Sequence, residues 1–372
     1  MHILKKAITA VALMFLVTDQ IYAFDFGAIT KSVVERVVVD TAVDTAVDAV
    51  ADGLTDDDAE QGDVRVTPQE LASAGPIVEA PLPVILETFR GSADVFSDRP
   101  KIAIAGYNIG AYQTAKVSES TSRGQGASVS MSFRLEGVDT SMLQRIADAA
   151  HADLVSQLQA AGIDVIDASA LFAASEANEI KRSSKPVEDK KSGRTSVKLV
   201  VVGPSDIGVV SSFGLIPKGF NGNVGDQASA ALDAIVIYPN VALDFVWTAG
   251  GGKKMLQKRV SVEGGARFAL DEISDCTAVY SKDGRFVDGS VELRPAEDVG
   301  VDDVFASVDE AGSKDNSTSV GISNAIGFAM GSRKGTEYLV TVDPKRYESL
   351  AMNATKGFNT ALVQQIKSAK GI

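Results

Sequence analysis

The residues able to do chemistry are few, and they do not form a recognisable catalytic or metal-binding set. His151 is the one histidine beyond the first residues, and Cys276 is the one cysteine. Zinc needs three or four such ligands, so these two residues cannot form a zinc site. His151 lies at the edge of the apolar stripe of a predicted helix, and no nucleophile for it is evident. We interpret His151 as a packed residue and Cys276 as a buried, inert thiol.

Two glycine-rich segments resemble phosphate-binding loops only superficially. Residues 250–254 read Gly-Gly-Gly-Lys-Lys, but the phosphate-loop spacing requires glycine where Trp247 stands and serine or threonine where Lys254 stands. Residues 203–208 lack the lysine that should follow. We predict a turn between two strands at 250–254.

Carboxylates are abundant, but their spacing marks neither a calcium loop nor an acid-base pair. In the acidic stretch 55–63, counted from Asp56, glycine falls at position seven instead of six, and position twelve is not glutamate. We therefore assign no catalytic, cofactor-binding or metal-ligating residue and predict no cofactor. A hydrolase that uses carboxylates, or the Ser/Thr side chains of the glycine-rich region 203–226, remains the alternative.

The amino terminus has the pattern of a secretion signal. Lys5 and Lys6 precede an apolar run at 7–17, and a polar exit ends in Ile-Tyr-Ala23. This run is too short to span a bilayer, so we predict a signal peptide, residues 1–23, cleaved after Ala23. Secretion into a bacterial periplasm, or association with the outer membrane, follows. No later segment is long enough for a transmembrane helix.

The charge balance argues against one class of partner. The chain carries a net charge of −13, which repels phosphate backbones, so we expect no nucleic-acid binding. A single cysteine allows no disulfide within the chain, and stability must come from burial.

The first part of the mature chain differs in composition from the rest. Within residues 24–63, a Thr-Ala-Val-Asp repeat places valines and aspartates on neighbouring stripes of a predicted helix, residues 29–53. This helix is marginal alone and needs a surface to lie on. Residues 64–100 carry five prolines and predict an extended linker.

Residues 101–372 predict an α/β (α+β) body, a mixed sheet with helices packed on it. Strands are expected at 102–117, 126–136, 163–167, 197–202, 235–238, 242–248, 259–262, 276–280, 285–293 and 337–342. Helices are expected at 141–161, with Ser141 and Gln144 spaced as a capping box, and after Asp343-Pro344 as a C-terminal amphipathic helix. The charged stretch 176–195 predicts a loop.

Two alternating strands could provide surfaces. In 126–136 the residues Ala127, Val129, Met131, Phe133 and Leu135 point one way, and we expect this face to cover the helix 141–161. Contact of the 102–136 hairpin with lipid is the alternative. Residues 320–330 alternate large apolar side chains with small ones, which fits a strand with a smooth face or a glycine-rich helix.

Several of these segments together resemble a known family. Lys101-Ile-Ala-Ile-Ala-Gly106, the helix 141–161 with Leu154, Val155 and Leu158, and Gly162-Ile-Asp-Val-Ile-Asp167 resemble the periplasmic domain of the curli secretion channel family. The amino-terminal domain of the Tol translocation protein has a similar order. The resemblance spans residues 100–345 and implies a ring-forming α/β domain at the outer membrane with lipid-facing hairpins. The lipidated cysteine of that family is missing here, and the hairpin precedes the helix.

The expected function follows from these patterns. We expect a secreted, non-enzymatic protein that acts by assembly, including ring formation, or by binding, with itself or another envelope protein as partner. A periplasmic hydrolase or small-ligand-binding protein is the alternative. Membrane association would not involve a transmembrane helix.

Overall fold

The computed structural model describes residues 80–97, 101–120, 128–174, 179–191, 195–210, 222–251, 259–284, 288–301, 305, 307–310, 325–330 and 333–372. The predicted signal peptide, the acidic helix and residues 64–79 and 98–100 of the predicted linker lie outside these residues. The described part of the linker includes a strand, Leu86–Gly91, and a 3-10 helix, Ala93–Phe96.

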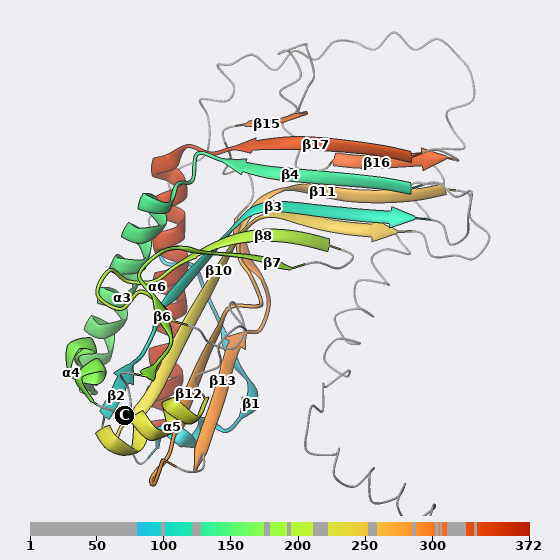
Figure 1. Cartoon of the computed structure of the whole chain (residues 1–372). Helices are drawn as coiled ribbons and strands as arrows, with labels where there is room; N and C mark the ends of the chain where they lie inside the picture. The colour runs from blue at the N-terminus through green and yellow to red at the C-terminus, as the bar shows by residue number, and fades with distance from the viewer. Residues whose placement is uncertain are drawn as a thin grey trace, which may run out of the picture. The chain divides into compact units, whose positions relative to one another are not determined.

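The predicted fold class is confirmed: a mixed sheet carries helices packed on it (Figure 1). The main path of a 15-stranded sheet runs β1-β13-β12-β10-β3-β4-β17-β15. Its strands up to residue 202 are β1 (Leu86–Gly91), β2 (Lys101–Ile104), β3 (Asn108–Ser120), β4 (Ser128–Glu136), β5 (Asp164–Ile166), β7 (Val187–Lys191) and β8 (Thr195–Val202). The later ones are β10 (Ile235–Gly251), β11 (Arg259–Leu270), β12 (Asp275–Tyr280), β13 (Gly289–Pro295), β14 (Val299–Val301), β15 (Ser307–Glu310), β16 (Ala325–Met330) and β17 (Arg333–Thr341).

The remaining elements are helices and one small sheet. The short strands β6 (Arg182–Ser183) and β9 (Val209–Val210) pair with each other. The helices are the 3-10 helix η2 (Ala93–Phe96), α3 (Thr140–Ala160), α4 (Ala168–Ala173), α5 (Gly222–Leu232) and α6 (Pro344–Lys370).

Helices cover both faces of the sheet in the α/β body. Successive residues of β2, and Ala105 directly after it, alternate between two hydrophobic clusters: Ile102 and Ile104 belong to the larger one, Ala103 and Ala105 to the smaller. The larger cluster contains the buried stripes of α3 and α6, and the smaller contains residues of α4 and α5. The body is therefore a three-layer arrangement.

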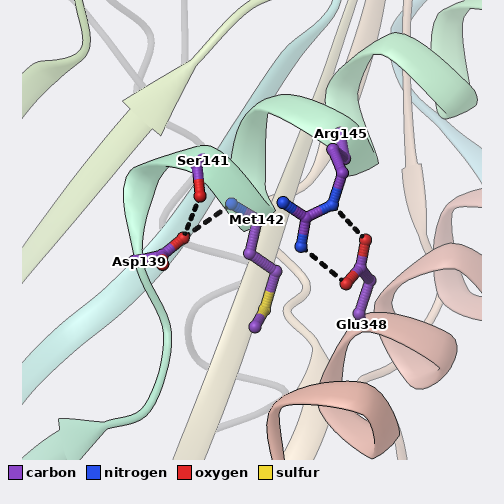
Figure 2. Close-up of polar contacts among 5 residues, drawn as sticks. All are labelled: Asp139, Ser141, Met142, Arg145 and Glu348. Atoms are coloured by element: carbon purple, nitrogen blue, oxygen red, sulfur yellow. Dashed lines mark hydrogen bonds and ion pairs between the residues drawn. The ribbon is translucent and has the colours of Figure 1, made fainter.

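The helices α3 and α6 lie side by side (Figure 1) and are joined by polar contacts. Figure 2 shows the Arg145 guanidinium donating to both oxygens of Glu348, at 2.7 and 2.8 Å. Deeper in the interface, the Tyr107 hydroxyl donates to Asn359 Oδ1 at 2.7 Å, and Asn359 Nδ2 donates to the carbonyl of Ala150. The predicted stripe of α6 is buried throughout: Tyr347, Leu350, Ala351, Ala354, Phe358, Leu362 and Ile366.

The predicted caps of the two long helices have different outcomes. Asp343 caps α6 by accepting from Arg346 N, as predicted. At α3 the capping box of Ser141 and Gln144 is wrong: Asp139 is the N-cap, and its Oδ1 accepts from Met142 N and the Ser141 hydroxyl (Figure 2). A carboxylate one residue before the helix competes successfully with a serine inside it.

Some predicted strand boundaries are wrong. The single strand 102–117 is two strands, β2 and β3. A Cβ on Gly106 would lie 2.8 Å from Val210 Cβ, so the chain is tightly packed between them. The strands predicted at 235–238 and 242–248 form one strand, β10, which passes through Pro239. The charged segment 176–195 is not only a loop, because β7 pairs with β8 at an edge of the sheet where charged side chains can stay solvated.

The strands β3 and β10 diverge at one point. We call this point the fork: residues 111–114 of β3 and 243–246 of β10. Up to Ala111 and Leu243 the two strands pair in parallel. Beyond it β3 pairs with β4 and β10 pairs with β11, both antiparallel, and each strand has a register shift at the fork. Two strand layers begin there, and Figure 1 shows them extending away from the helices.

The predicted hairpin of β3 and β4 is confirmed, but the expected contact of its apolar face with α3 is wrong. The Phe133 ring stacks on Tyr338 of β17 at 5.3 Å, and its edge lies against the backbone of Gly264 in β11. Met131 is fully buried as well. The apolar face of β4 thus faces the second strand layer, while α3 packs on β3, β5, β8 and α6. Glycine at 264 allows the ring this close approach.

Candidate functional site

Two of the three exposed large hydrophobic side chains among the described residues lie near each other in sequence, at the start of the body. They are Ile85, at 67% exposure, and Phe89, at 39%; the third, Ile372, at 60%, is the last residue. Leu86, between the first two, is 2% exposed and anchors the strand in the core. We call Ile85 and Phe89 with their strand the β1 patch.

The β1 patch lies on a strand that ends the sheet path. Among the described residues β1 pairs only with β13, and the register shifts around Phe89, which makes Phe89 a bulge residue. Gln365 of α6 donates to the carbonyl of Leu86 at 2.8 Å and fixes the first residue of the strand. An edge strand with apolar side chains is a ready contact surface for another polypeptide.

Arginines flank the aromatic ring of the patch. The guanidinium carbon of Arg294 lies 3.8 Å from the centroid of the Phe89 ring, and that of Arg90 lies 5.3 Å from it. Arg294 also donates to Glu292 at 2.7 Å. The ring is held in place by these contacts, so the patch is preorganised and combines aromatic, aliphatic and cationic character.

A groove lies between the loop at 203–209 and the segment 182–186. Its cavity measures about 350 Å³, and its lining includes Arg182, Ser184, Lys185, Ser205 and Asp206. The loop is fixed by α3: Gln144 donates to the Gly203 carbonyl, and Asp148 accepts from both the backbone N and the hydroxyl of Ser205.

Among the described residues, the groove does not contain a nucleophile paired with a general base. The Ser205 hydroxyl donates to Asp148 at 2.8 Å, so its proton points to a carboxylate and not to an imidazole. His151, one turn further along α3, is half-buried, and burial lowers its pKa against the opposing effect of Asp206, Asp148 and Asp167. The rest of the glycine-rich region proposed for a hydrolase includes residues 211–221, which lie outside the described residues.

A third group of polar residues lies at the fork, and the sequence analysis missed it. We call Tyr112, Asp244, Asp271, Asp298 and Tyr347 the fork cluster. Asp244 Oδ1 accepts from Phe245 N at 2.7 Å and from Val246 N at 3.1 Å, so it holds the backbone at the register shift of β10.

Burial and mutual repulsion set the protonation of the fork cluster. Burial, and then the charge of Asp271, raise the pKa of Asp244 well above its ordinary value. Burial raises the pKa of Asp271 to about 6, although hydrogen bonds from Ile273 N and from the Tyr112 hydroxyl work in the opposite direction. The available signal in the sequence was an aspartate inside one apolar strand run, at Leu243-Asp244-Phe245, and another directly after a strand, at Leu270-Asp271.

The other residues singled out from sequence have these positions. Cys276 is fully buried in β12, and burial raises the pKa of its thiol, in line with an inert role. The strands β10 and β11 flank the glycine-lysine segment as predicted, although residues 252–258 lie outside the described part. Within 320–330, residues 325–330 form the strand β16, so of the two predicted alternatives this part is a strand and not a helix.

Within the described ranges, no group of three or more histidine, cysteine, aspartate or glutamate side chains is arranged to hold a metal ion. No helix among the described residues combines the length and apolar character needed to cross a membrane. No protein-family model, curated protein or solved structure matches the chain.

Proposed function

We propose that this is a secreted, non-enzymatic protein that acts by assembly, and that the β1 patch is where one copy contacts the next. The observation that carries the proposal is a pair of exposed apolar residues: Phe89 on the edge strand β1 and Ile85 directly before it. Arg294 already holds the Phe89 ring in position. Burying such residues against a partner stabilises association by about 25 cal/mol per Å² of apolar surface.

The resemblance to the curli secretion channel family supports a ring as the form of assembly. A ring needs a contact in which one surface of a copy meets a different surface of the next. The periplasmic or outer-membrane location belongs to the same proposal and is supported by the predicted signal peptide, residues 1–23. Another envelope protein in place of a second copy is the other form of the proposal.

Light scattering on the mature protein, over a range of concentrations and with or without mild detergent, tests the assembly. We expect a species larger than one chain. The double variant Ile85→Ser, Phe89→Ser should reduce it to the monomer without altering the circular dichroism spectrum. Ile372→Ser is the matched control, because it removes an equally exposed apolar residue elsewhere.

The outcomes separate the alternatives. A monomer under every condition would refute self-assembly and the lipid-facing hairpin together. A large species that persists in the double variant would place the contact elsewhere than β1. A species that appears only in detergent would point to membrane contact through strands already in the fold.

The groove at 182–209 favours small-ligand binding as the second candidate function. Its volume suits a small polar molecule, and its lining mixes cationic and hydroxyl side chains. A screen of esters, peptides and glycans with the purified protein tests both ligand binding and the hydrolase alternative. Inactivity and the absence of any thermal shift across the screen would remove this candidate.

A further inference from the structure

The fork cluster brings carboxylates from three parts of the chain, and tyrosines from two more, to the place where two strands diverge. Asp244 comes from β10, and Tyr112 comes from β3. Asp271 and Glu272 come from the turn after β11, and Asp298 comes from the turn before β14. Glu272 N donates to Asp298 Oδ1 at 2.8 Å, which ties these two turns together.

The charges that act on the cluster are mainly of one sign. The carboxylates of Asp298 and Glu272 oppose ionisation of Asp271, and Asp271 and Asp298 oppose ionisation of Asp244. The Ile273 amide and the Tyr112 hydroxyl both donate to Asp271, and these two neutral groups favour its charged form. Partly buried carboxylates whose charges act on one another resist ionising together and favour keeping a proton.

Tyr347 of α6 independently indicates that the fork cluster needs a proton that can form a hydrogen bond. Its side chain is 3% exposed, its ring meets Phe268 edge-on, and its hydroxyl has no hydrogen-bond partner among the residues that the structure describes. The charge of Asp244 acts directly on this hydroxyl and opposes its ionisation. A protonated Asp244 is a donor, and the unused oxygen of Tyr347 is an acceptor beside it.

The cluster is linked to the backbone geometry of the fork. Asp244 Oδ1 binds the two amides at the register shift of β10. Asp271 is bound to the same strand, because its backbone N donates to the carbonyl of Ala242 at 2.9 Å. A change of charge on either carboxylate therefore acts on the residues that set where β10 leaves β3.

We propose that the fork cluster is a pH-sensitive element: its carboxylates take up a proton from water at mildly acidic pH, which fixes the divergence of β3 and β10, and release it at higher pH, which loosens the fork. The pKa of Asp271, raised to about 6, places the transition between mildly acidic and neutral conditions. Burial and the charge of Asp271 shift the pKa of Asp244 in the same direction, well above its ordinary value.

Hydrogen exchange of the full chain between pH 3.5 and pH 8, corrected for the intrinsic exchange rate, tests the proposal. In the parent we expect protection of peptides covering 108–116 and 242–250 to fall as the pH rises from about 4 to 6, by about tenfold for each pKa unit of the Asp271 shift, and to level off above pH 6. Peptides from α3 should not change. Asp271→Asn should abolish the pH dependence, and Glu272→Gln, next to it but exposed, should retain it.

A second variant covers the case in which Asp271→Asn does not fold. Tyr112→Phe removes the hydroxyl that lowers the pKa of Asp271, so the midpoint of the exchange transition should move to higher pH. A parent without any transition at the fork, a transition unchanged in Asp271→Asn, or an unmoved midpoint in Tyr112→Phe would each overturn the proposal.

Discussion

Substitution of Gly264 tests whether the two strand layers pack face to face within one chain. A Cβ at this position would lie 2.8 Å from Phe133 Cζ, 2.9 Å from Phe133 Cε2 and 3.1 Å from the Trp247 carbonyl oxygen. Carbon atoms in contact sit at about 3.5–4.0 Å, so the methyl of Gly264→Ala must displace the ring by several tenths of an ångström or more. Overpacking of this kind costs about 1–3 kcal/mol.

A double-mutant cycle isolates the contact. Phe133→Leu alone should cost about 1 kcal/mol, because a shorter side chain still fills most of the site. Leucine does not reach as far as the ring edge, so in the double variant the new methyl fits. We expect the double variant to be more stable than the sum of the single effects predicts, by at least about 1 kcal/mol.

Urea unfolding followed by the fluorescence of Trp247, the one tryptophan in the chain, provides the measurement. Gly335→Ala is the control, since Gly335 is an exposed glycine in β17 whose added methyl meets only the movable Ser130 hydroxyl at 3.2 Å. It should leave stability unchanged or raise it slightly. Additivity of Gly264→Ala and Phe133→Leu within about 0.5 kcal/mol would refute the packing of β4 on β11.

Three further predictions concern other parts of the body. Asn359→Leu should lower the free energy of unfolding in urea by at least about 2 kcal/mol, because it leaves the buried Tyr107 hydroxyl without its acceptor in the α3–α6 interface. Adding Tyr107→Phe to the same chain should recover part of this loss. Asp271 has a pKa of about 6 in the folded protein against an ordinary value of 3.8, so its contribution to the free energy of unfolding is fully present below pH 3.8 and is lost as the pH rises to 6. Over that window the free energy of unfolding of the parent should fall by about 3 kcal/mol relative to Asp271→Asn. Parallel curves of stability against pH for the two proteins would contradict the assignment. Asp139→Ala should lower the melting temperature, whereas Asp139→Asn should preserve it, since asparagine also accepts the Met142 amide bond; equal losses would mean that charge, not capping, is what matters.

The elements with strong local patterns could be predicted from the sequence. The helices at 140–160 and 344–370 have long apolar stripes at helical spacing, and the β3–β4 hairpin has strict alternation. The prediction that failed concerned which element covers an apolar strand face. The residues Val129 to Leu135 indicate that one side is dry, but the covering element, β11, lies more than 120 residues later, and no local pattern specifies it.

The same limit applies to the candidate sites. The β1 patch falls in a segment whose prolines, among them Pro81 and Pro83, indicated only an extended linker, and nothing there signals that Leu86 pairs with Pro295. The fork cluster assembles residues from positions 112 to 347, so its carboxylates looked like isolated polar interruptions of apolar strands. Burial created their chemistry, and burial depends on the tertiary fold.

The continuity of β3 and β10 across the fork has a consequence for how the molecule comes apart. Each strand belongs to the three-layer body along its first residues and to the strand layers along its last ones, with no linker between. Neither part can therefore be excised as an autonomous fragment, since any cut leaves one of them without two of its central strands. The body and the strand layers should melt in a single cooperative transition, and mechanical load applied to the hairpin ends would be carried directly into the strands beneath α3 and α6.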